Sequence, residues 1–274
     1  MLNVKFLYHG LTACSLLLNA CSNSDSDRGE IHVNFDHVIA GAELVPSEIR
    51  YTNAAGNEYA ITRLEYIVSD IILETVAGER VYLTQVHYRN ALSNATRSLS
   101  AHIPGGEYSF LHFTFGIDGG KNETGALPSL EHFNNMAWPS PMGGGYHYMR
   151  MEGLFRIPDG EGSFLTHTGP SGGGDFSFSV SLPLNLSVNG GSWGITVVMD
   201  INQWYDAPTV YDFNDRGSIM GNADAQFTLQ ENGTAAFSIS NAGRHGHDAH
   251  EHEGEENHEE TAGEEQNHEE HADD

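Results

Sequence analysis

The chain has 274 residues, a formal net charge of −26 and 39% hydrophobic residues. That length allows one large domain with its own core, and the acidity argues against nucleic acid as a partner, because nucleic-acid binding needs a basic face. The charge is unevenly placed, since residues 244–274 hold thirteen acidic residues against Arg244 alone.

The first twenty residues have the layout of a signal peptide. Lys5 gives a basic start, residues 6–18 are mostly apolar, and Leu18-Asn19-Ala20 leads directly to Cys21. The apolar run is shorter than the roughly 20 residues of a transmembrane helix. A cysteine after such residues is the lipobox arrangement, which predicts a lipid on Cys21 and a tether over residues 21–29. A plain secretory signal with a chance cysteine is the alternative.

This N-terminus predicts a lipoprotein of the cell envelope. We expect it in the outer membrane, facing either the periplasm or the surface, with the membrane as a partner through the anchor. Cys14 leaves with the signal and Cys21 carries the lipid, so the mature body can form no internal disulfide. Its own core must hold it together.

Residues 30–242 have the pattern of a β domain. Ile31, Val33 and Phe35 alternate with polar residues, which is typical of a half-buried strand. Further apolar segments follow at 81–86, 108–115, 176–180 and 195–198, separated by glycine and asparagine clusters. Residues 61–73 suit a helical face or a strand, and their β-branched content favours a strand. The sequence predicts an all-β, single-domain antiparallel sandwich or barrel with long loops, and Pro183 at a strand edge or bulge.

The C-terminal tail, residues 243–274, is expected to be disordered. It has no aliphatic or aromatic side chain larger than alanine, so it cannot bury enough apolar surface to offset its ordering entropy. Neutral imidazole binds Cu²⁺, Zn²⁺ and Ni²⁺, so we expect weak binding of several divalent ions. An acidic tail whose histidines only tune its charge is the alternative. The histidines concerned are His245, His247, His250, His252, His258, His268 and His271.

A second group of metal-binding residue types lies inside the body. The group comprises His132, Met136, Trp138, Met142, His147, Met149 and Met151. If residues 146–152 form a strand, His147, Met149 and Met151 share one face. Imidazole beside thioethers suits Cu(I), and His167 follows at the mouth of a glycine-rich loop. Taken singly, each of these residues is more typical of a core.

Enzyme signatures are poor. The sequence has no Gly-x-Ser-x-Gly elbow, phosphate loop or His-Glu-x-x-His motif, so we expect no enzymatic activity. The aspartates at 200, 206, 212 and 215 lie close together but lack EF-hand spacing. We interpret them as loop carboxylates rather than a calcium site.

Several segments, in their order and spacing, carry a family resemblance. They are 33–35, 51–56, 61–69, 103–108, 113–118, 136–138, Gly145-Tyr146-His147-Tyr148-Met149 and 152–153. In these the chain resembles the MbnP family of periplasmic copper-binding proteins, related to the copper-repressible surface proteins MopE and CorA. The resemblance implies a β-rich body that binds one copper ion, Cu(I) or Cu(II), through histidines. His147 and His167 fit best, with His132 or Met149 as a third ligand nearby.

The resemblance also implies a partner. Some members use a tryptophan that a di-haem enzyme of the MbnH type oxidises to kynurenine. In the MopE-type site that tryptophan stands two residues before a ligand histidine, and no tryptophan here has that spacing. Trp138 is the expected oxidation target because it lies near the histidine and methionine group.

Two functions follow as hypotheses. The first is a lipid-anchored copper-binding protein for copper acquisition, buffering or sensing. The second is a structural or adhesive β-sandwich whose tail binds metal incidentally.

Overall fold

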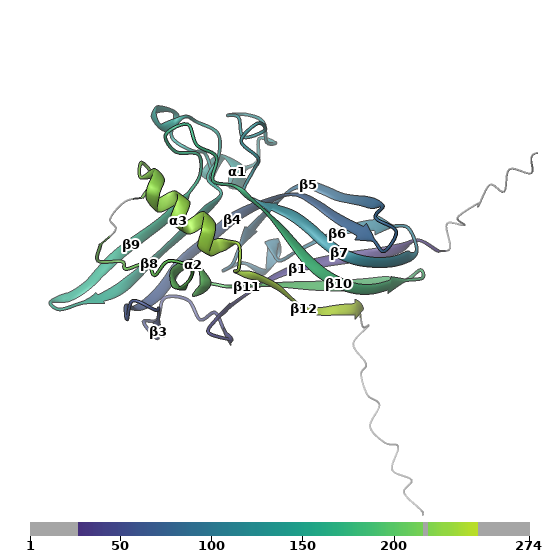
Figure 1. Ribbon diagram of the computed structural model, residues 1–274, viewed down its shortest axis with the longest axis horizontal. Helices are drawn as coiled ribbons and strands as arrows, with labels where there is room; N and C mark the ends of the chain where they lie inside the picture. Colours follow the sequence, from purple (N-terminus) through teal and green to yellow (C-terminus); the bar gives the residue numbers. More distant parts are fainter. Residues whose placement is uncertain (1–26, 216–218, 246–274) are drawn as a thin grey trace, which may run out of the picture.

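The computed structural model describes residues 27–215 and 219–245. The signal peptide, Cys21 and the tail histidines from His247 onward lie outside these residues. Within them, the strands form two sheets (Figure 1). Sheet A has the order β12-β11-β1-β2, with β6 also paired to β1. Its strands are β1 (Gly29–Ile39), β2 (Ala42–Glu43), β6 (Ser98–Ile103), β11 (Ser192–Asp200) and β12 (Phe237–Arg244).

Sheet B has the order β10-β7-β4-β8-β9, and β3 and β5 also pair with β4. Its strands are β3 (Tyr51–Thr52), β4 (Glu58–Thr75), β5 (Arg80–Asn90), β7 (Gly106–Phe115), β8 (Met149–Ile157), β9 (Gly160–Thr168) and β10 (Phe178–Val188). The helices are α1 (Glu131–Asn135), α2 (Gln203–Asp206) and α3 (Ala223–Gly233), with short 3₁₀ turns η2 (Asn94–Thr96) and η3 (Ser140–Met142).

The core lies between the two sheets. Along β1, buried residues alternate with more exposed ones over the whole strand, as its period-2 pattern predicted. Phe35 of β1 meets Phe113 of β7 edge-on at 5.9 Å between ring centroids, and Phe113 meets Phe237 of β12 at 5.3 Å. The sandwich is therefore the observed one of the two expected architectures. The pairing is antiparallel except between β1 and β11, which run parallel.

The long strand β4 organises sheet B. It covers residues 61–73, so the preference for a strand there was right. β8 pairs with its first half, over Tyr59–Tyr66, and β7 with its second half, over Val68–Thr75. β8 and β9 therefore extend from one end of the sandwich and carry the candidate site. Pro183 stands at a register shift between β10 and β7, as expected for a residue that cannot donate to the ladder.

The helix α3 is an exception to the expected β structure. Its buried face carries the polar residues Gln226, Thr228 and Asn232 beside Ala225 and Leu229, so no apolar stripe reveals it in the sequence. Side-chain hydrogen bonds fix it instead, because Asn232 Nδ2 donates to the carbonyls of Trp204 (3.0 Å) and Thr209 (2.8 Å).

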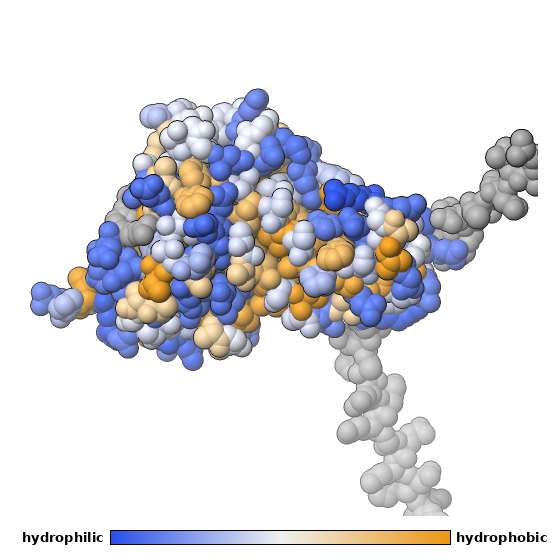
Figure 2. All heavy atoms as spheres, viewed as in Figure 1, coloured by the Kyte–Doolittle hydropathy of each residue, from blue (hydrophilic) through white to orange (hydrophobic). Residues whose placement is uncertain are grey.

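The last strand ends slightly later than the sequence predicted. β12 continues through Gly243 and Arg244, two residues beyond the expected end of the body at 242. Within residues 27–215 and 219–245, no helix is long and apolar enough to cross a membrane. Figure 2 shows apolar side chains scattered among hydrophilic ones over this face of the molecule.

Candidate metal centre

A tight reversal of the chain places His147 beside Trp138. Residues 136–138 pair with residues 145–147, since Trp138 N donates to Gly145 O (2.9 Å) and His147 N donates to Met136 O (2.7 Å). The intervening Gly143, Gly144 and Gly145 all have positive φ, which glycine adopts without steric cost. The glycine run therefore sets His147 at its position just before β8.

The ring of His147 is buried and has a fixed tautomer. Its Nδ1 lies 3.0 Å from the carbonyl oxygen of Met136, and because a carbonyl only accepts, Nδ1–H must be the donor. Nε2 then carries the lone pair, and this buried atom has no hydrogen-bond partner among the residues that the structure describes. Burial lowers the pKa of His147 to about 4, so the imidazole is neutral at pH 7. It has the form that binds metals.

His167 faces His147 from the neighbouring strand. The two ring centroids lie 5.3 Å apart, with the ring planes at 84°. His167 Nε2 lies 2.9 Å from Glu152 Oε1, and an ionised carboxylate only accepts, so Nδ1 of a neutral His167 carries the lone pair. Burial lowers the pKa of His167, although its bond to Glu152 opposes this. Both rings therefore offer one unprotonated nitrogen at neutral pH.

The spacing of the rings suits a shared ion. A metal–imidazole bond of about 2.0 Å puts each ring centroid about 3 Å from the metal, so two ligand rings have centroids at most about 6 Å apart. The observed 5.3 Å lies within this limit. The ring spacing and the unpartnered Nε2 of His147 are therefore compatible with a metal ion shared by the two imidazoles.

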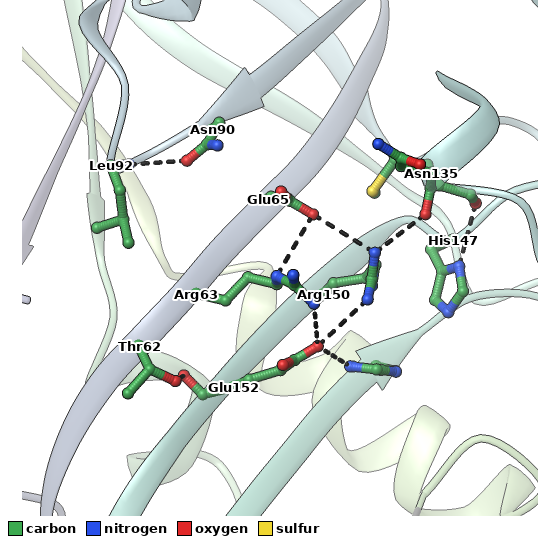
Figure 3. A network of polar contacts seen from close by, with 11 residues as sticks. Thr62, Arg63, Glu65, Asn90, Leu92, Asn135, His147, Arg150 and Glu152 are labelled. Atoms are coloured by element: carbon green, nitrogen blue, oxygen red, sulfur yellow. Dashed lines mark hydrogen bonds and ion pairs between the residues drawn. The ribbon is translucent and has the colours of Figure 1, made fainter. Parts of the chain in front are cut away.

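An ion network holds Glu152 against His167. Glu152 Oε1 also accepts from Arg63 Nη1 (2.9 Å) and Arg150 Nη2 (3.4 Å), and Glu65 lies against both arginines (Figure 3). Burial alone would raise the pKa of Glu152, but hydrogen bonds from Arg63 and His167 lower it below its usual value. Glu152 is therefore a fixed anionic acceptor for the His167 ring.

Trp138 covers one side of the pair. Its ring centroid lies 4.7 Å from that of His147, and its Nε1 donates to Met142 O (3.2 Å). It packs on Gly169, where a Cβ atom would lie 2.6 Å from the indole. Gln226 of α3 fixes the same loop, since its Nε2 donates to His167 O (2.8 Å) and its Oε1 accepts from Gly169 N (3.1 Å).

The other predicted ligands are placed differently. Met149 is fully buried in the core of β8, opposite Tyr66 and Thr168 in register. The expected strand over 146–152 begins only at Met149. His132 of α1 stacks on Tyr88 at 4.8 Å. None of the hydrogen bonds or ring contacts of His147 and His167 given above involves either residue.

Few potential protein ligands surround the two histidines. Within residues 27–215 and 219–245, no three or more His, Cys, Asp or Glu side chains gather closely enough to hold a metal. The aspartates of the 200–215 region act as loop carboxylates, since Asp206 Oδ1 accepts from Ala54 N (3.0 Å) and Asp212 Oδ1 from Asn57 Nδ2 (3.0 Å).

Sequence reasoning named the two histidines that the structure brings together but did not name Glu152, the two arginines or Gln226 beside them. A signal for the network was present in the alternating charges at 63/65 and 150/152. Its meaning depended on the register that sets Glu65 opposite Arg150 and Arg150 opposite His167.

Comparison with known proteins identifies a matching family and a similar fold. The sequence profile of the MbnP family matches residues 28–221. Among solved structures, the fold is similar to that of MbnP from Methylosinus trichosporium, with a TM-score of 0.56 and 15% identity over 77% of this chain and 98% of that chain. At this identity the similarity concerns the fold. No curated protein matches the sequence.

Proposed function

The chain belongs to the MbnP family, and on this basis we propose that it is an extracytoplasmic protein that binds one copper ion between His147 and His167. The observation that carries the proposal is the buried Nε2 of His147, which has no hydrogen-bond partner within residues 27–215 and 219–245 and lies beside a second neutral imidazole. A buried polar atom without a hydrogen bond is costly, and a metal ion would satisfy it.

The donor set favours Cu(I). Two imidazoles with few further protein ligands make a low-coordinate site, whereas structural Zn²⁺ usually requires four ligands. The ring N–H groups are bound to Met136 O and Glu152, which is the outer-shell arrangement that orients metal-binding histidines. Such a site would serve copper acquisition, buffering or sensing. Cu(II), and a third ligand from His132 or Met149 after rearrangement, are the variants of this proposal.

The anchor and the tail complete the proposal. Cys21 would carry the lipid that holds the protein in the outer membrane, on the periplasmic or the outer surface. The tail histidines would bind further divalent ions weakly. Cys21 and the tail beyond His245 lie outside the described residues, so these parts rest on the sequence.

Trp138 is the side chain we propose for oxidation by an MbnH-type di-haem partner. Its ring lies against His147 although its sequence spacing differs from the MopE-type pattern. Conversion of the indole to kynurenine would open its five-membered ring and turn Nε1, which donates to Met142 O, into an aniline nitrogen, and so would change the wall of the copper site. Mass spectrometry of the mature protein tests for it, and an unmodified Trp138 in copper-loaded native protein would contradict this part.

The copper site is tested in a full-length chain without tail ligands. In this "tail-silent" chain, each histidine from His247 onward is replaced by Asn. We expect one tightly bound copper, lost in His147→Ala and in His167→Ala. His112→Ala is the matched control, because His112 also lies on a strand beside a glutamate, Glu74 at 3.3 Å, but makes no ring contact with another histidine among the described residues.

Thermal unfolding of each variant separates ligand loss from misfolding. Two folded variants that both keep one tight copper would refute the site. A parent chain that binds no copper would favour the structural or adhesive sandwich instead.

The anchor has its own test. Cys21→Ser should leave an unprocessed precursor without lipid, because the thiol is the proposed attachment point. A variant that is still matured and acylated would show that Cys21 is not the lipidated residue.

A further inference from the structure

A second pair of histidines meets on the outer face of sheet A, away from the proposed copper site. The rings of His32, on β1, and His245, just after β12, stack at 4.8 Å between centroids with 27° between their planes. We propose that this pair is a second metal site, which takes one divalent cation of the Ni²⁺ or Cu²⁺ type.

The middle strand explains how the two rings meet. β11 lies between β1 and β12, with Gly194 opposite His32 in register. His245 N donates to Ser192 O (2.9 Å) and so extends the pairing past the end of β12. A Cβ at residue 194 would lie 3.3 Å from His245 Nδ1. Gly194 therefore leaves the space in which the His245 ring crosses β11.

A carboxylate adjoins the pair. Glu30 Oε2 lies 3.7 Å from His32 Nε2, with side-chain exposures of 42% and 26%. Imidazole and carboxylate are ligand types that suit Ni²⁺, Cu²⁺ and Zn²⁺, although Glu30 does not form a three-ligand group with the two rings as they stand among the described residues. Because the site is open to solvent, water can fill the remaining positions, and the exposed side chains can turn from stacking to coordination.

The position of the pair gives binding a structural effect. The start of β1 and the end of β12 lie at the same end of the body (Figure 1), and His32 and His245 come from opposite ends of the described chain. A cation held by both would tie these ends together, and binding to the folded state alone raises stability by mass action. It would also fix the point from which the tail departs.

The test uses the tail-silent full-length chain and NiCl₂, followed by calorimetric titration and thermal unfolding. We expect one Ni²⁺ per chain at this pair and a rise in Tm with Ni²⁺. His32→Ala and His245→Ala should each weaken this binding at least tenfold and remove the Tm shift. Gly194→Val keeps both histidines but crowds the His245 ring, so it should weaken binding by less than either histidine variant does. His112→Ala, which removes a histidine from sheet B, should bind as the parent does.

Two results would overturn the proposal: no Ni²⁺ binding by the parent, or undiminished binding by both histidine variants. Far-UV circular dichroism confirms that each variant is folded. Copper binding at His147 and His167 does not depend on this pair, so it should persist in His32→Ala. Failure here is thereby distinguishable from failure of the proposed copper site.

Discussion

Two pairs of imidazole rings have similar centroid separations but differ in their exposure to solvent. The rings of the buried pair, His147 and His167, lie 5.3 Å apart. The rings of the exposed pair, His32 and His245, lie 4.8 Å apart. In the buried pair each ring N–H has a fixed acceptor, Met136 O or Glu152. The exposed rings lie nearly flat against each other, with Glu30 at 3.7 Å from His32. Burial thus selects the tautomer and the direction of the lone pair before any metal arrives.

The surroundings also bear on which metal each pair is proposed to bind. A buried pair of imidazole nitrogens suits a low-coordinate soft ion such as Cu(I), whereas an exposed pair beside a carboxylate suits divalent ions that retain water. One β-sandwich therefore offers two chemically distinct histidine pairs.

Copper retention at acid pH should differ most between the buried pair and free imidazoles. The pKa of His147 is lowered to about 4 by burial, so at pH 5 protons compete little for Nε2. A free imidazole, with a pKa of about 6.5, loses roughly 30-fold in metal affinity per ligand between pH 7.5 and 5. We expect the tail-silent chain to keep its copper at pH 5 and an isolated peptide of residues 246–274 to release Cu²⁺.

The sign of the accompanying stability change follows from the same lowered pKa. The folded state disfavours protonated His147. The contribution of the neutral ring to the free energy of unfolding is therefore complete above the unfolded pKa of about 6.5 and is lost as pH falls toward 4. Thermal unfolding of the copper-free protein across this pH range measures that contribution.

The copper-release experiment has its own contrary outcome. If the tail-silent chain and the peptide released copper over the same pH range, the buried pair would not be protected from protons.

Glu152→Gln should weaken the buried site by about 10- to 100-fold, the usual cost of losing an outer-shell partner. The amide no longer supplies the charge that orients His167, and Arg63 and Arg150 lose a counterion. Competition with a copper chelator measures the affinity. Glu74→Gln, beside the isolated His112, is the control and should leave copper affinity unchanged. If Glu152→Gln and Glu74→Gln lowered copper affinity equally, Glu152 would act only through the overall charge of the protein and not through its bond to His167.

The sequence predicted strands more readily than contacts. The alternation in β1, the β-branched run in β4 and Pro183 all act through local rules, so those strands and the bulge were predictable. Helix α3 was not, because hydrogen bonds from Asn232 rather than an apolar stripe hold it.

The candidate site divides in the same way. His147 and His167 stood out by residue type, but the bond from His167 to Glu152 depends on strand register. Trp138 does not stand two residues before a histidine in the sequence. The turn through Gly143–Gly145 nevertheless brings its ring into contact with that of His147. The exposed pair joins opposite ends of the chain, and no local pattern predicts that β1 and β12 flank β11.

Trp138→Phe tests how far the buried pair depends on its wall. The smaller ring leaves a void and removes the donor to Met142 O, so we expect a loss of about 1–3 kcal/mol in unfolding free energy and faster copper release. Trp193→Phe is the matched control, since Trp193 is also buried and donates to a carbonyl, Gly190 O at 2.6 Å. It should cost similar stability and leave copper release unchanged. Identical release rates would mean that Trp138 only packs.

Met149→Leu distinguishes a core residue from a thioether ligand. The substitution nearly conserves volume, so it should cost less than about 1.5 kcal/mol in unfolding free energy, and the placement of Met149 in the core predicts unchanged copper affinity. A clear loss of Cu(I) affinity without a loss of stability would instead make Met149 the third ligand and the buried site a mixed nitrogen–sulfur site.

Glu30→Gln should have the smallest effect, at the exposed pair. Glu30 and His32 are both partly in water, where a neighbouring charge is worth only a fraction of a kcal/mol to about 1 kcal/mol, so Ni²⁺ affinity should fall by about 2- to 5-fold. Glu58→Gln, which removes the same charge from β4 in the other sheet, controls for the overall field. Titration at two salt concentrations sharpens the result, because a screened charge effect shrinks with salt while a direct bond to the metal persists. A loss above tenfold that resists salt would make Glu30 a third ligand, and the exposed site would then hold its ion with more protein ligands than the buried pair.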